Sequence, residues 1–389
     1  MPTRPSQACV DILAKLVSFD SVSRNSNLPL IEWVVSYLNE HGVASKLIFN
    51  ADGTKANLFA TIGPGTRNGV VLSGHTDVVP VDGQAWSSDA FTLREADGKL
   101  FARGTCDMKG YLAAILAAVP ALARSPLSRP VHLAFSYDEE VGCKGVPSLL
   151  QHITDAGIEP AGCIVGEPSM MRVVDAHKGS RNYQCKVTGL EGHASHLPRA
   201  VNAIAYAAKI ISYIHDVSEE FAAQGPFDER FDIAHDTLTT NLIHGGLARN
   251  IIPKECEFVF GYRYLPDTDP DQLFEHIATY AKDQVLPLMR SKSAQTDITF
   301  SMQSNNPALL PNAPDWLAFV SSICGEGTPG QRVSFMTEAG LFQRAGIPCV
   351  VCGPGNIAQA HKPDEFVSLE QLAQCEHMLE QLRQRLRLH

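Results

Sequence analysis

The sequence of 389 residues predicts an α/β protein whose mostly parallel, mixed sheet belongs to one domain, with a ferredoxin-like α+β domain inserted into it. Three observations support this prediction. Strand-like and helical segments alternate up to about residue 179, the order changes to β-α-β-β-α-β between residues 180 and 303, and the alternation resumes after residue 304. We therefore predict a first domain made of residues 1–179 and 304–389 and a second made of residues 180–303.

Apolar periodicity defines the elements of the first domain. The segments with helical periodicity are 9–19, 111–123 and 315–323, and the strand-like runs are 57–63, 69–74, 131–137, 162–167 and 348–353. A final helix is predicted from an apolar stripe with helical spacing, which consists of Leu369, Leu372, Cys375, Leu379, Leu382 and Leu386.

The inserted domain has a different order of elements. Its predicted strands are 181–189, 237–246, 256–266 and 296–304, and its predicted helices are 202–217 and 271–289. The strands and helices follow one another in the β-α-β-β-α-β order of a compact ferredoxin-like module.

Composition and charge exclude several classes of protein. The formal net charge of −10 argues against nucleic acid or an anionic membrane as a partner. No apolar run approaches the roughly 18 residues of a membrane span, and the first residues lack the apolar core of a signal peptide, so we expect a cytoplasmic protein. The ten cysteines are scattered along the chain and do not suggest a disulfide framework or a thiolate zinc site.

Two enzyme classes are also disfavoured by their motifs. The segment "GEGTPG" at 325–330 matches G-x-G-x-x-G, but it follows a predicted helix and has Pro329 where a helix should begin, so we do not interpret it as a dinucleotide site. The sequence contains no G-x-S-x-G motif, which disfavours a serine hydrolase.

Ionisable residues follow several predicted strands at the point where each strand ends. Because the carboxyl ends of parallel strands meet at one edge of a sheet, these side chains are expected to lie together. Imidazoles and carboxylates are ligands for divalent cations, and a cation would neutralise the repulsion between clustered acids. The residues are His75, Asp77, Asp138, Glu139, Glu140, Glu167 and His361, together with Asp107 just before a predicted helix. A set of solvated loop residues is the alternative.

The same segments carry a resemblance to a known family. In order along the chain they are "SGHTDVVPV", "RGTCDMKG", "YDEEVG", "VGEPS" and "GPGNIAQAH". This series resembles the acetylornithine deacetylase and succinyl-diaminopimelate desuccinylase family of dinuclear zinc amidohydrolases. The resemblance covers nearly the whole chain. It implies that the first domain is a zinc-hydrolase catalytic domain and that the inserted domain is a lid and dimerisation domain.

Site residues follow from the resemblance position by position. It implies two Zn²⁺ ions per subunit, with Co²⁺ or Mn²⁺ as possible substitutes, bridged by Asp107. One ion would be completed by His75 and Glu167, and the other by Glu140 and His361. Asp77 resembles the acid that orients the second nitrogen of His75. Glu139 resembles the general base that takes a proton from the attacking water.

The resemblance also assigns residues of the inserted domain. His193 would be the lid residue that donates to the oxyanion, reaching the active site of the partner subunit in a homodimer. Asn250 and Arg263 resemble residues that hold the substrate carboxylate, although Gly261 stands where the family often has an acid. His196 is interpreted as an ordinary loop histidine. The role of Arg249 is left open, with a solvated loop residue as one possibility.

The substrate is predicted from a short segment near the end of the chain. Thr337-Glu338-Ala339 resembles the acetylornithine deacetylase branch, in which Glu338 would pair with the side-chain ammonium of N-acetyl-L-ornithine. Glu338 could instead cap the following helix. Cys106, where alanine is more usual, is interpreted as a packing residue. Alternative substrates are succinyl-diaminopimelate, other N-acyl-amino acids and dipeptides, and a non-catalytic relative that binds an amino acid or metal is the alternative class.

Overall fold

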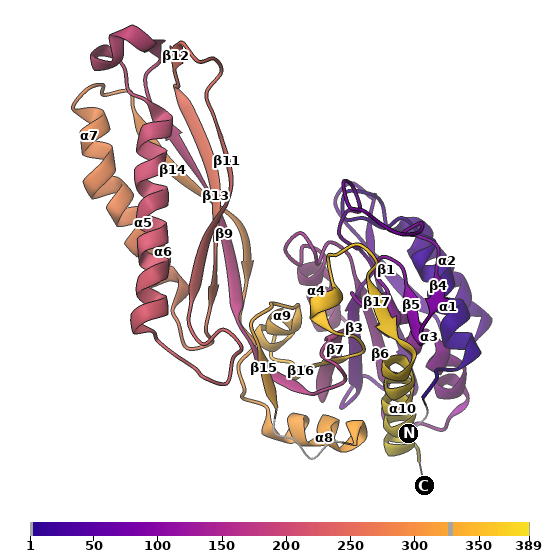
Figure 1. Cartoon of the computed structure of the whole chain (residues 1–389). Coiled ribbons are helices and arrows are strands. Elements are labelled where there is room, and N and C mark those ends of the chain that lie inside the picture. Colours follow the sequence, from indigo (N-terminus) through magenta and orange to yellow (C-terminus); the bar gives the residue numbers. More distant parts are fainter. Residues whose placement is uncertain (1–2, 326–329, 389) are drawn as a thin grey trace. The chain divides into compact units, whose positions relative to one another are not determined.

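The computed structural model describes residues 3–325 and 330–388, and the chain divides into two compact units. The first unit comprises Met1–Ala176, Leu309–Arg332 and Thr337–His389, and the second comprises His177–Ala308 and Val333–Met336. The colours of Figure 1 show that the first unit combines early and late segments of the chain. Most of the segment discussed above as a G-x-G-x-x-G match lies outside the described residues.

The first unit is built on a mixed sheet, which in the described residues has eight strands in the order β1-β2-β6-β3-β7-β16-β8-β15. Its central strands β6, β3, β7 and β16 are parallel, whereas β1, β2 and β8 pair antiparallel with their neighbours. This confirms the predicted mostly parallel mixed sheet. The strands are β1 (Ser45–Phe49), β2 (Ala56–Ile62), β3 (Val70–His75), β6 (Val131–Ser136), β7 (Gly162–Pro168), β8 (Val174–His177), β15 (Gln331–Val333) and β16 (Cys349–Gly353).

Helices cover both faces of this sheet (Figure 1). Leu72 of β3 packs in the core cluster that includes α3, whereas the next residue, Ser73, contacts Glu338 at the start of α9. Because successive strand residues point to opposite faces, α3 and α9 cover opposite faces. The helices are α1 (Gln7–Val17), α2 (Leu28–Glu40), α3 (Lys109–Arg124), α4 (Val146–Asp155), α8 (Pro314–Cys324), α9 (Ala339–Arg344) and α10 (Leu369–Leu386), with a 3₁₀ turn η3 (Ile357–Gln359).

The final helix has the apolar face that the sequence predicts. All six residues of the predicted stripe on α10 are buried, and they pack in the same core cluster as α1 and α3. A separate small sheet in the order β17-β5-β4 combines two parts of the chain and is made of β4 (Arg94–Ala96), β5 (Lys99–Phe101) and β17 (Phe366–Ser368). Within the described residues, no helix has both the length and the apolar character that a membrane crossing requires.

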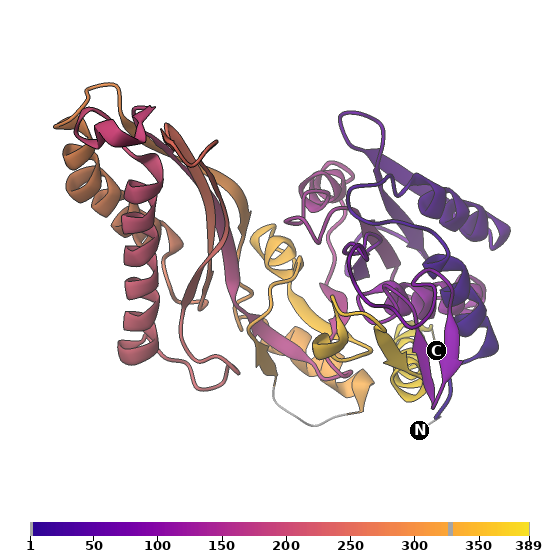
Figure 2. The ribbon, with the colours of Figure 1, turned by 45° about the horizontal axis from the view of Figure 1, so that its top comes forward.

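The second unit contains a four-stranded antiparallel sheet in the order β11-β13-β9-β14. Figure 2 shows its helices along one face of the sheet, where α5 packs on β11, β13 and β9. The elements are β9 (Gly179–Thr188), β10 (Gly192–His193), η1 (Ala194–Arg199), α5 (Ala203–Gln224), β11 (Thr237–Gly245), β12 (Ile251–Ile252), β13 (Glu255–Tyr264), α6 (Pro270–Tyr280), the π turn η2 (Ala281–Val285), α7 (Leu286–Arg290) and β14 (Asp297–Asn306).

The prediction of one continuous helix over 271–289 is wrong. The segment is divided into α6, a π turn and α7. Pro287 lies in the first turn of α7 and has no N–H group to donate to the carbonyl of residue 283, so regular α-helical bonding cannot pass through this point.

Candidate metal centre

The carboxyl ends of the parallel strands bring the predicted ionisable residues to one edge of the first unit's sheet. His75 ends β3, Glu167 lies next to the last residue of β7, and Glu139 and Glu140 follow β6 within four residues. His361 is in the loop after β16, and Asp107 lies in the turn before α3. Parallel pairing of β3 with β6 and β7 therefore explains why residues far apart in sequence meet here.

Asp107 lies between two imidazoles. Its Oδ1 is 3.0 Å from His75 Nε2, and its Oδ2 is 3.3 Å from His361 Nε2. Each carboxylate oxygen thus faces a different histidine. This is the arrangement expected of a carboxylate that bridges two cations, one beside each imidazole.

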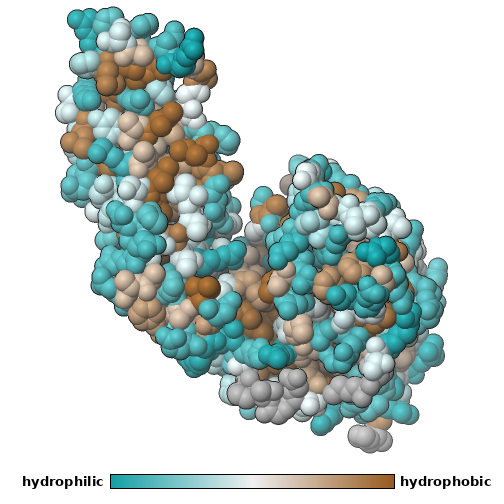
Figure 3. All heavy atoms as spheres, in the orientation of Figure 1, coloured by the Kyte–Doolittle hydropathy of each residue, from teal (hydrophilic) through white to brown (hydrophobic). Residues whose placement is uncertain are grey.

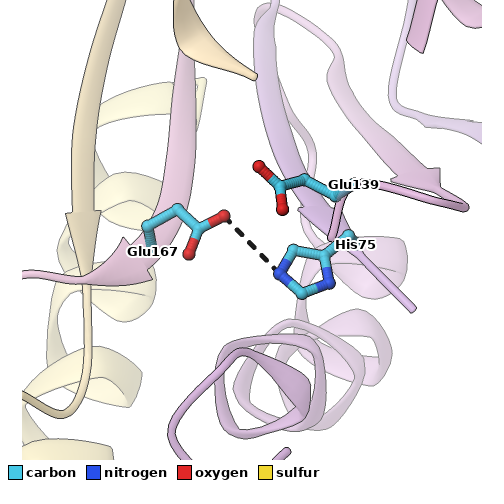
Figure 4. Close-up of side chains that lie close together, drawn as sticks. All are labelled: His75, Glu139 and Glu167. Atoms are coloured by element: carbon cyan, nitrogen blue, oxygen red, sulfur yellow. Dashed lines mark ion pairs between the residues drawn. The ribbon is translucent and has the colours of Figure 1, made fainter. Parts of the chain in front are cut away.

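Two overlapping groups of side chains have ligand atoms close enough to hold a cation. The potential ligand atoms of His75, Glu139 and Glu167 all lie within 4.8 Å of one another, and so do those of His75, Asp107 and Glu140. Figure 4 shows the carboxyl groups of Glu139 and Glu167 pointing toward His75, with Glu167 Oε1 3.6 Å from His75 Nε2. On the other side, His361 Nε2 is 3.0 Å from Glu140 Oε2.

Glu139, Glu140 and Glu167 resist ionisation in the absence of a cation, whereas the pKa of Asp107, despite its burial, is lowered by hydrogen bonds to His361 and His75. Burial, together with the charges of Glu140 and Asp107, raises the pKa of Glu139 to about 8. Burial and Asp107 raise the pKa of Glu140 to about 7, and burial raises the pKa of Glu167 well above its usual range. Hydrogen bonds to Asp107 and Glu140 raise the pKa of His361 to about 10. A nearby divalent cation would remove the cost of keeping several carboxylates ionised together.

The donor set fits a pair of divalent cations. Glu140 Oε1 and Glu167 Oε1 are buried and have no hydrogen-bond partner in the described part of the chain. Buried acceptors without partners are rare because each costs free energy. Imidazole nitrogens and carboxylate oxygens are the ligands that zinc and related cations take in proteins. The cluster therefore has the free acceptors and the ligand chemistry that such ions need.

Asp77 contacts His75 through a different atom from the one predicted. His75 Nδ1 is 2.8 Å from the main-chain carbonyl oxygen of Asp77, but 3.7 Å from its carboxylate. The carboxylate instead accepts hydrogen bonds from the Ser23 hydroxyl at 2.6 Å and from the backbone N–H groups of Glu139 and Glu140 at 3.1 and 3.3 Å. The main-chain carbonyl of Asp77 thus orients His75, and the carboxylate of Asp77 orients the loop that carries Glu139 and Glu140.

The predicted role of Glu338 in pairing with a substrate ammonium is wrong. Its side chain is fully buried, and its two oxygens accept hydrogen bonds from the hydroxyls of Ser73 at 2.5 Å and Ser136 at 2.7 Å. The alternative role in capping is also not observed, because the cap bond to the N–H of Ala339 comes from Thr337 Oγ1. The side chain of Glu338 lies behind the strands that carry His75 and lead to Glu139.

Cys106, beside Asp107, is a packing residue, as predicted, whereas the thiol of Cys143 contacts Glu139 Oε1 at 3.5 Å. Cys106 is buried, its thiol donates to the carbonyl of Asn356 at 3.3 Å, and burial raises the pKa of the thiol. Cys349 and Cys352 are spaced as C-x-x-C on β16, but residues three apart on a strand point to opposite faces. They therefore do not form a thiolate pair.

The other predicted residues belong to the second unit. His193 is exposed on β10, with its Nδ1 2.7 Å from the hydroxyl oxygen of Ser195. The centres of the His193 ring and the exposed His196 ring are 6.1 Å apart. Arg249 and Asn250 are exposed just before β12, and Arg263 is exposed on β13. Their roles remain predictions.

Gly261 has a local explanation. A Cβ at this position would lie 2.2 Å from Asn182 Oδ1, and Asn182 is held by a hydrogen bond to Ser304. A side chain at position 261 would therefore require Asn182 to move.

Sequence reasoning missed several polar residues around the centre. Glu365 and Arg103 form a buried ion pair at 2.7 Å beside the turn that carries Asp107. Lys55, which was also missed, forms an ion pair at 2.5 Å with the predicted Asp138, next to Glu139. Arg103 lies within the segment "RGTCDMKG", and Glu365 follows His361 by four residues, so their proximity to the family-like segments was the available signal.

Comparison with known proteins agrees with this geometry. The family model described as "Peptidase family M20/M25/M40" matches residues 71–385. The acetylornithine deacetylase of Pasteurella multocida (strain Pm70) is 32% identical over 366 residues, covering 94% of this chain and 93% of the relative. The acetylornithine deacetylase of Myxococcus xanthus is 33% identical over 377 residues, covering 94% of each.

Solved structures show the same fold at lower identity. An M20 family metallo-carboxypeptidase from Sulfolobus solfataricus is 19% identical, with a TM-score of 0.75 over 97% of this chain and 99% of that one. The YXEP protein of Bacillus subtilis, described as a dinuclear metal-binding peptidase, is 15% identical, with a TM-score of 0.67 over 97% of both chains. The family match and the full-length relatives do not support a non-catalytic protein. The chain is a metal-dependent amide hydrolase and belongs to peptidase family M20/M25/M40.

Proposed function

We propose that this enzyme hydrolyses N-acetyl-L-ornithine to L-ornithine and acetate, as a cytoplasmic step of arginine biosynthesis. The observation that carries the catalytic part of the proposal is the position of Asp107 between His75 and His361, with Glu139 beside them. The choice of substrate is supported by the names of relatives about 30% identical over almost the full length. The choice of substrate does not rest on Glu338, whose carboxylate accepts hydrogen bonds from Ser73 and Ser136.

The proposed cofactor is a pair of Zn²⁺ ions, for which Co²⁺ or Mn²⁺ could substitute. Asp107 would be shared by both ions, His75 and Glu167 would hold one, and Glu140 and His361 would hold the other. When bound, the ions would polarise the amide carbonyl and make water a stronger acid.

Glu139 is the proposed general base. It is buried, and its backbone N–H is fixed by the Asp77 carboxylate, so its side chain is held beside the cluster. Its carboxylate would accept a proton from the attacking water and then give that proton to the nitrogen of the departing amine. Both proton transfers use the same oxygen atoms, so no further acid is required at this point.

Residues of the second unit would recognise and stabilise the substrate. We propose that Asn250 and Arg263 hold the α-carboxylate of the substrate and that His193 donates a hydrogen bond to the developing oxyanion. His193 has an exposed imidazole on a short strand, which leaves the ring accessible to a substrate.

A homodimer formed through the second unit is part of the proposal. Strand β11 is at the edge of the sheet, and the C-terminal half of the strand is exposed. Exposed apolar residues gather there and nearby, with exposed fractions of 56% for Leu242, 51% for Ile243 and 91% for Leu247. Figure 3 shows hydrophobic side chains gathered on the visible face of this unit. An exposed apolar edge strand is suited to pairing with a second copy.

The substrate is tested by comparing initial rates for N-acetyl-L-ornithine, N-succinyl-diaminopimelate and a dipeptide with the zinc-loaded protein. We expect kcat/KM for acetylornithine to exceed the other two by at least about 100-fold, which is about 2.7 kcal/mol of transition-state discrimination. The best of the other substrates serves as the reference for active protein. A higher kcat/KM for either competitor would reject acetylornithine as the substrate while leaving the proton-transfer role of Glu139 intact.

The proposed dimeric role of His193 is tested by mixing two inactive variants, His193→Ala and Glu139→Ala. If His193 acts in the site of the partner subunit, a mixed dimer contains one complete site, and up to about half of the sites in each mixed dimer should recover activity. Subunit exchange is verified with differently tagged chains. Absence of recovery in verified mixed dimers would show that His193 does not act across the interface.

A further inference from the structure

The turn before α3 surrounds a buried carboxylate that the proposed mechanism does not use. Glu365 is 1% exposed and lies just before β17. Its Oε1 accepts hydrogen bonds from the backbone N–H groups of Cys106 at 2.8 Å and Asp107 at 3.0 Å. Its Oε2 accepts from the N–H of Gly104 at 3.0 Å and from Arg103 Nη1 at 2.7 Å. Both oxygens of this carboxylate are therefore fully used as acceptors.

These contacts fix the backbone from which Asp107 extends. Three of the four donors are consecutive or nearly consecutive N–H groups in the turn 104–107, so the carboxylate sets the shape of that turn. A buried charge is costly unless it is paired and hydrogen-bonded, and here both conditions are met. Movement of the turn would break several of these bonds together, and this opposes displacement of Asp107.

The same ion pair also reaches the loop of His361. Arg103 Nη1 donates to the carbonyl of Lys362 at 3.2 Å, and Arg103 Nη2 donates to Gln84 Oε1 at 2.6 Å. Gln84 Nε2 in turn donates to the main-chain carbonyl of His361 at 2.9 Å. His361 needs such support because its side chain is 54% exposed and its loop lies outside the sheet.

One buried ion pair thus connects the backbones of two residues whose side chains are 3.3 Å apart. We propose that Glu365 is a positioning residue that, with Arg103 and Gln84, holds Asp107 and His361 at the separation required for the second cation. This inference rests on the proposed metal assignment. It adds a residue that touches neither substrate nor cation. Outer partners of metal ligands typically change metal affinity or activity by about 10- to 100-fold when they are replaced.

The test is Glu365→Gln, which keeps the size of the side chain but presents an amide N–H₂ to donors that require an acceptor. Circular dichroism verifies folding, and zinc binding is measured by competition with a chromogenic chelator. We expect the affinity of the weaker zinc site to fall by about 10- to 100-fold. The activity-against-zinc curve should shift to higher zinc by the same factor, with activity regained at excess zinc. A purely structural defect would not be reversed by zinc in this way.

The matched control is Glu376→Gln, which removes a carboxylate that accepts hydrogen bonds from Ser6 at the start of α1. It should leave both zinc affinities unchanged. Unchanged zinc affinities in folded Glu365→Gln would overturn the inference. If that variant does not fold, Gln84→Ala decides: it leaves the ion pair in place but removes the bond to His361, and unaltered zinc binding would again reject the role. Failure of the unmodified protein to bind two zinc ions would instead reject the metal assignment itself.

Discussion

Replacing Glu139 with glutamine is expected to lower kcat by about 10²- to 10⁴-fold while both zinc ions remain bound. The amide has nearly the same shape as the carboxylate but cannot accept a proton from water, so the loss measures general acid–base catalysis. The backbone contact that holds residue 139 comes from Asp77 and does not involve the replaced group. Steady-state kinetics and metal analysis of the same protein preparation test both parts of this expectation.

Glu159→Gln is the matched control for this substitution. Glu159 is an exposed glutamate of the same unit that pairs with Arg67, so its replacement removes one negative charge without touching the cluster. Its kcat should stay within about twofold of the unmodified enzyme. A Glu139→Gln enzyme with nearly normal turnover would remove Glu139 from the mechanism, and loss of zinc would show that Glu139 is a ligand rather than a base.

Replacing His75 or His361 with alanine is expected to lower the zinc content from two ions to about one and to reduce kcat/KM by at least about 100-fold. Each imidazole faces a different oxygen of Asp107, so each substitution should affect a different ion. The His75 variant should lose more activity than the His361 variant. His75 is fully buried among three carboxylates, whereas His361 is partly exposed. Metal stoichiometry after gel filtration tests the loss of one ion in each variant, and kcat/KM distinguishes the two variants.

The control for these two histidines is His215→Ala, which changes an exposed residue on α5. It should bind two zinc ions and retain its activity. If both His75→Ala and His361→Ala also retain two ions, the assigned ligand set is incorrect. If only one of them does, the ion that it was assigned to hold must be bound by other side chains.

The sequence allows the ionisable residues at the edge of the sheet to be predicted, but not the hydrogen bonds of the buried polar residues behind them. β3, β6, β7 and β16 are recognisable because they are short apolar runs, and their parallel order brings His75, Glu139, Glu167 and His361 together. α2 was not predicted, although Pro29 in its first turn is a helix-start signal.

Glu338 and Glu365 show why the remainder could not be predicted. Ser73 and Ser136 are 265 and 202 residues from Glu338, and the backbone donors to Glu365 are about 260 residues away. Polar pairs at such separations leave no periodic pattern in the sequence. The choice between a pocket-facing Glu338 and a buried one depends on which face of the sheet α9 covers, and only the packed structure supplies this information.

The division of the first unit along the chain determines when the enzyme can be completed during synthesis. His75, Asp107, Glu139, Glu140 and Glu167 all precede the second unit, whereas Glu338, His361 and Glu365 follow it. Domains generally fold as units and from the N-terminal end as the chain leaves the ribosome. The second unit is therefore fully synthesised while the first still lacks β16, α9 and α10. A nascent chain of this length would carry the acidic cluster without its second histidine, and hydrolysis would begin only after the downstream segments had joined the sheet.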